Sequence, residues 1–60
     1  MTAREQSIVA KLRHITADLR RTGKLMHTPI GHDVRVLDPQ HFALGIELAI
    51  RVIEQEAADG

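Results

Sequence analysis

The sequence predicts a mainly α-helical protein whose two helices form an antiparallel hairpin. Three observations lead to this fold class. Apolar residues recur at helical spacing over residues 3–22 and 39–57, residues that start or stop helices bound both segments, and turn-forming residues lie in the connection 23–37. With 60 residues and no cysteine, the chain should form one domain, 1–60, near the lower size limit for folding without a disulfide or a metal.

The first helix is predicted from about residue 3 to residue 22. Thr2 and Glu5 have the spacing of a capping box, in which two side chains satisfy free backbone N–H groups at the start of a helix. Gly23 follows at the position where a left-handed residue commonly ends a helix. The main apolar residues have the four, three, four spacing of a coiled-coil seam, which serves one packing partner. They are Ile8, Leu12, Ile15 and Leu19.

The second helix is predicted from Pro39 to about Ala57. Asp38 is a favourable N-cap, Pro39 suits the first helical position, and Leu37 is placed to pack against Phe42 as a hydrophobic staple. The apolar face of this helix is wide and covers roughly 220° of its circumference. Its residues are Phe42, Ala43, Ile46, Leu48, Ala49, Ile50, Val52 and Ile53.

The apolar faces of the two helices differ in width. The narrow apolar face of the first helix cannot cover the whole apolar face of the second. A second copy of the chain is the simplest cover, and it would give a homodimer with a four-helix arrangement. Gly45 and Ala49 lie four positions apart on the wide face and would let a partner's backbone approach closely; a glycine that is merely tolerated is the alternative. The residues expected to associate are Phe42, Ile46, Ala49, Ile50 and Ile53.

Residues 23–37 are predicted to form either a short β-hairpin or an irregular loop. Residues 33–37 alternate as a strand does, and the β-branched Val34 and Val36 favour extended backbone. Residues 28–31 have the composition of a turn, and 24–28 would supply the other strand. A hairpin would make the chain α-β-β-α, although two strands alone are only marginally stable in water.

The formal net charge of zero hides a division of charge along the chain. Residues 1–24 hold six basic and two acidic residues, a net charge of +4, whereas residues 38–60 hold one basic and five acidic residues, a net charge of −4. Glu54 and Glu56 lie at the negative end of their helix dipole and require a nearby cation. Antiparallel packing would bring Arg4 beside them, either within the chain or across a dimer.

The sequence does not predict an enzyme, a cofactor or a metal centre. His14, His27, His32 and His41 lack the spacing of known metal-binding motifs, and a metal site at a dimer interface that uses His27 and His32 is the weaker alternative. The histidines have no evident nucleophile as a partner, and a chain this small seldom encloses a substrate pocket. The glycines lack the spacing of nucleotide-binding loops.

These features favour a small non-enzymatic protein–protein interaction module, or an accessory or regulatory factor, that acts as a homodimer. The alternative is a dimeric DNA-binding regulator whose first helix contacts phosphates. The residues for that role would be Lys11, Arg13, Arg20, Arg21 and Lys24. A polar N-terminus and the absence of any stretch of roughly 20 apolar residues predict a cytoplasmic protein. The short length is typical of prokaryotic or phage accessory proteins.

Overall fold

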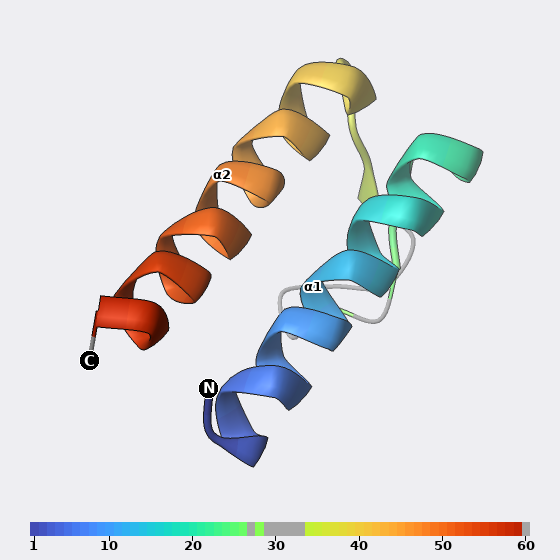
Figure 1. Ribbon diagram of the computed structural model, residues 1–60. Coiled ribbons are helices and arrows are strands. Elements are labelled where there is room, and N and C mark those ends of the chain that lie inside the picture. The colour runs from blue at the N-terminus through green and yellow to red at the C-terminus, as the bar shows by residue number, and fades with distance from the viewer. Residues whose placement is uncertain (27, 29–33, 60) are drawn as a thin grey trace.

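The computed structural model describes residues 1–26, 28 and 34–59. In chain order the elements are α1 (Ala3–Thr22), β1 (Lys24–Leu25), β2 (Val34–Arg35) and α2 (Pro39–Asp59). The two helices lie side by side and run in opposite directions, so that both chain termini lie at the same end of the molecule (Figure 1). The predicted fold class is confirmed: the chain is mainly α-helical, with a short β-hairpin between the helices.

Helix α1 begins and ends at the residues that the capping pattern predicts. The Thr2 side chain accepts a hydrogen bond from the Glu5 backbone N–H at 3.2 Å, and the Glu5 carboxylate accepts one from the Thr2 backbone N–H at 2.9 Å. Hydrogen bonds to the Glu5 carboxylate, first from the Thr2 backbone N–H and then from the Thr2 side chain, lower the pKa of this carboxyl. At the other end Gly23 adopts φ 75°, and its N–H donates to the Leu19 carbonyl at 2.8 Å.

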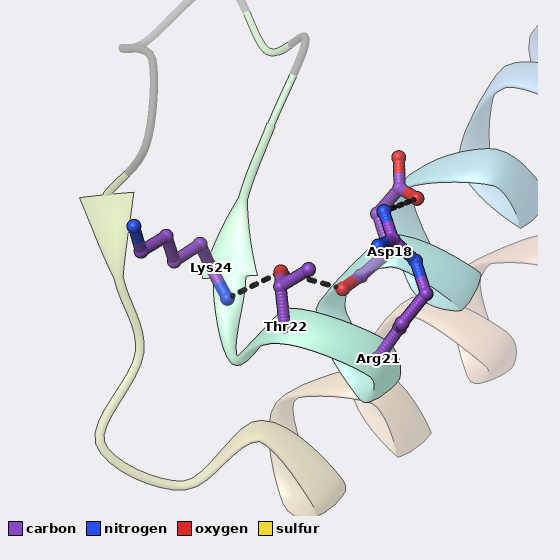
Figure 2. A network of polar contacts seen from close by, with 4 residues as sticks. All are labelled: Asp18, Arg21, Thr22 and Lys24. Carbon is purple, nitrogen blue, oxygen red and sulfur yellow. Dashed lines mark hydrogen bonds and ion pairs between the residues drawn. The ribbon is translucent and has the colours of Figure 1, made fainter.

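Side-chain bonds secure the junction between α1 and β1, as Figure 2 shows. The Thr22 hydroxyl donates to the Asp18 carbonyl at 2.8 Å and accepts from the Lys24 backbone N–H at 3.2 Å. Arg21 reaches back along the helix to the Asp18 carboxylate, with 3.0 Å between nitrogen and oxygen. The turn out of the helix is therefore bonded on both sides of Gly23.

The β-hairpin is antiparallel and very short. Lys24 pairs with Arg35 and Leu25 pairs with Val34, and the Val36 N–H extends the ladder by donating to the Gly23 carbonyl at 3.0 Å. The second strand is shorter than the predicted alternation over 33–37. Residues 29–31 of the predicted turn lie outside the described residues.

Helix α2 begins as predicted at its N-cap but without the staple. The Asp38 carboxylate accepts from the His41 backbone N–H at 3.2 Å, and the Asp38 carbonyl accepts from the Phe42 N–H at 3.1 Å. Leu37 is fully exposed, so the predicted staple against Phe42 is wrong. The start of this helix therefore has capping hydrogen bonds but no hydrophobic contact from Leu37.

The core is small and lies between the helices. Its apolar residues are Val9, Ile15, Leu19, Ala43 and Ile50, and they are accompanied by the buried Thr16. The hydroxyl of Thr16 donates to the Leu12 carbonyl at 2.9 Å, which satisfies its hydrogen bonding within the helix.

The predicted four-residue seam on α1 is partly wrong. Ile8 is 45 % exposed, whereas Val9, which is not one of the four seam residues, is fully buried. The reason is that α1 contacts two neighbours, α2 on one side and β1 on another, so its buried face is broader than a seam for one partner and is rotated relative to it.

Candidate protein interaction surface

The boundary between α1 and α2 has two chemically different edges. On one edge, Arg13 pairs with Glu54 at 2.9 Å, and Arg20 pairs with Glu47. Both pairs are well exposed, so each contributes at most about 1 kcal/mol and serves mainly to align the helices. The sequence analysis expected Arg4 as the cation beside Glu54. Within the chain, Glu54 pairs with Arg13 instead.

The opposite edge is apolar and hollowed. A shallow groove of about 350 Å³ lies between the helices there. Leu12 lines it from α1, and Phe42, Gly45, Ile46 and Ala49 line it from α2. Since none of the described residues that line this groove is charged, contact with water is unfavourable for most of its surface.

The apolar lining continues from the groove around the outside of α2. Phe42 is 46 % exposed, Val52 53 % and Leu48 65 %, and Leu44 is similarly open to solvent. Between residues 42 and 53 the only charged side chains are Glu47 and Arg51. We define the apolar face of α2 as the exposed or half-exposed residues of this stretch. They are Phe42, Leu44, Gly45, Ile46, Leu48, Ala49, Val52 and Ile53.

Gly45 lies near the middle of the apolar face and is uncovered. A Cβ atom built on this glycine would meet nothing within 4 Å. Within the single chain, therefore, no neighbour requires a glycine at this position, although glycine costs about 1 kcal/mol relative to alanine inside a helix.

The five predicted association residues occupy three environments. Phe42, Ile46 and Ala49 line the groove, and Ile53 is half-buried nearby on the same helix. Ile50 is 4 % exposed and lies in the intrachain core, so within this chain it is covered by α1 and not open to a partner. The sequence reasoning placed Leu12 in the intrachain seam and did not count Leu44 or Leu48 among the association residues. Leu44 and Leu48 are recognised once the exposure of each residue of α2 is known.

Comparison with protein-family models, curated proteins and solved structures finds no match to this chain. Its function is therefore inferred from its own surface chemistry. Within the described part of the chain, neither helix combines the length and hydropathy needed to span a bilayer.

Three of the five residues proposed for nucleic-acid contact already form ion pairs. Arg13 and Arg20 pair with acidic residues of α2, and Arg21 pairs with Asp18. Phosphate binding would have to displace these carboxylates or act against their charge. The observed ion pairs therefore disfavour the DNA-binding alternative.

Among the described histidines, His41 forms a side-chain pair with a carboxylate. Nδ1 of His41 lies 2.6 Å from Oδ2 of Asp38, where the ring N–H donates to the carboxylate. This bond, together with the one from the His41 backbone, lowers the pKa of the Asp38 carboxyl. Among the described residues no group of three potential metal ligands comes together, and His27, His32 and Asp33 lie outside them. The visible role of the pair is to cap α2.

Proposed function

We propose that this protein is a small non-enzymatic protein–protein interaction module, an accessory or regulatory factor that acts as a homodimer. The observation that carries the proposal is the apolar face of α2, which forms one continuous surface with the interhelical groove. Extended apolar surfaces on small soluble proteins are typical of interaction sites.

The total surface of the chain supports self-association. It exposes 4589 Å², whereas a folded monomer of its mass, 6.7 kDa, is expected to expose about 3,900 Å². The excess, about 700 Å², is close to the roughly 800 Å² that each partner buries in a standard protein–protein interface. One interface of ordinary size would return the chain to the exposure typical of a folded protein.

Absolute mass by light scattering over a hundredfold range of concentration, with a thermal melt at each end, tests this proposal. We expect a dimer whose melting temperature rises with concentration, because association stabilises the folded chain by mass action. A monomer throughout the range would overturn the homodimer and would leave the apolar face without its proposed cover.

A matched pair of substitutions tests whether the dimer interface lies on α2. Ala49→Glu introduces a charge into the groove and should yield a monomer, whereas Ala10→Glu makes the same change at an exposed position on α1 and should leave the dimer intact. Circular dichroism of both variants checks that the helices persist. A dimer unaffected by Ala49→Glu would show that another surface associates.

A further inference from the structure

The apolar face of α2 contains a seam that is regular enough to define how two copies pack. Phe42, Gly45, Ala49 and Val52 are spaced three, four and three positions apart, and all four are exposed. This is the spacing by which one helix packs along another. We call these four residues the α2 seam.

We infer that α2 of a second copy covers the α2 seam and runs antiparallel to the first, with Gly45 of each copy facing Ala49 of the other. This inference rests on the proposed homodimer and specifies its geometry. The two-fold axis then passes level with residue 47, so that Phe42 of each copy faces Val52 of the other. Small residues meet at the centre of the contact and large residues meet at both ends.

The size of the side chains favours this arrangement. Helix axes come closest where the contacting side chains are small, and crossing helices diverge on either side of that point. Phe42 and Val52 then fill the widening space, while Gly45 and Ala49 occupy the narrowest point. The close approach also explains the glycine, since the space around Gly45 is empty in the single chain.

The distribution of charge selects the antiparallel direction. Because α1 and α2 run in opposite directions, the β-hairpin end of the molecule holds the end of α1 and the start of α2. Among the described side chains, that end carries Arg20, Arg21, Lys24 and Arg35 against Asp18 and Asp38, a net charge of +2, whereas the opposite end carries Glu5, Glu54, Glu56 and Asp59 against Arg4, a net charge of −3. Antiparallel copies place the acidic end of one beside the basic end of the other and oppose their α2 dipoles. Parallel copies would place like charges together.

Distances between spin labels in the intact dimer test the direction directly. The chain has no cysteine, so Gln40→Cys and Ala58→Cys each provide a single labelling site. Both positions are exposed and lie on the side of α2 away from the seam. With 1.5 Å of rise per residue about residue 47, antiparallel copies separate the two labels at 40 by about 21 Å along the axis and those at 58 by about 33 Å.

The outcomes separate the inference from the proposed function. A longer distance at 58 than at 40, in a sample of dimeric mass, supports antiparallel packing. Equal distances at both sites in a dimer would mean parallel, in-register helices, and distances that follow neither pattern would place α2 outside the interface; each result overturns the inference and leaves the homodimer standing. A monomeric mass would overturn both.

Gly45→Leu tests the close approach without removing apolar surface. Leucine is a better helix former than glycine and has room in the single chain, so the folded monomer should persist. Leucine would overpack the closest point of the contact, so the dimer dissociation constant should rise by roughly fivefold to a hundredfold. Gln40→Leu, on the other side of α2, is the control and should leave it unchanged. A Gly45→Leu dimer as tight as wild type would contradict the close contact.

Discussion

At the scale of single residues, Asp38 determines how α2 begins. Its carboxylate holds both the backbone and the ring of His41, while its carbonyl accepts from the Phe42 N–H. One residue thus satisfies backbone donors of the first turn and places negative charge at the positive end of the helix dipole. The sequence pattern identified this cap and placed His41 in the first turn that it closes.

Because the folded-state pKa of Asp38 is lowered, its ionised form contributes stability that depends on pH. That contribution is present above the ordinary carboxyl pKa of about 4 and is lost as pH falls through the lower folded-state value. Asn remains a good N-cap but carries no charge, so wild type should be more stable than Asp38→Asn near neutral pH, and the difference should shrink in acid. Urea unfolding of both proteins from neutral to acidic pH measures this. A difference that does not change with pH would contradict it.

At the scale of elements, the end of α1 and the start of the β-hairpin depend on one backbone conformation. Gly23 has φ 75°, and a Cβ atom placed on it would lie 3.7 Å from Cγ of Pro39, an ordinary contact. A lack of room for a side chain therefore does not explain the glycine at this position. The left-handed backbone explains it, since this conformation lets the Gly23 N–H donate to the Leu19 carbonyl and the Gly23 carbonyl accept from the Val36 N–H.

Gly23→Ala should lower the free energy of unfolding by about 1 to 2 kcal/mol, the cost of holding an L-residue in the left-handed region. The same change at Gly45, inside α2, should raise it by about 1 kcal/mol when measured dilute enough for the chain to be monomeric. Chemical denaturation of the two variants at one concentration compares them. Equal effects at both positions would show that the conformation of Gly23 is not what glycine provides there.

At the scale of the whole molecule, few side chains hold the fold together. Only five apolar residues are buried among those described, and Leu19 is completely enclosed. A chain of this length is expected to have about 3 to 9 kcal/mol of stability in all. Each core residue therefore carries a large share of it.

Leu19→Ala should remove about 2 to 5 kcal/mol, a large share of the total, because it deletes buried methyl groups from a core with few others. Leu37→Ala is the matched control, since Leu37 is fully exposed and lies outside the apolar face of α2, so its truncation should cost far less. Far-ultraviolet circular dichroism during urea titration measures both. Similar losses in the two variants would mean that burial in the core is not the source of the effect.

Much of the architecture could be read from local patterns. Thr2 with Glu5, Gly23, and Asp38 with Pro39 mark helix ends through bonds that reach only a few residues along the chain, so the sequence identifies them directly. The excess of apolar residues on α2 is likewise a property of the sequence, and it predicted an uncovered face before any neighbour was known.

The tertiary structure decided which side of each helix is covered. It buried Val9 in place of Ile8, enclosed Ile50, left Leu37 in solvent and paired Glu54 with Arg13. It also divided the interhelical boundary into a charged edge and an apolar edge, and so separated the core from the candidate interaction surface. Periodicity gives the angle of one residue relative to another on the same helix, but the rotation of that helix depends on all its neighbours at once. For α1 those neighbours include β1, which forms only when Lys24 and Leu25 pair with Arg35 and Val34 of β2.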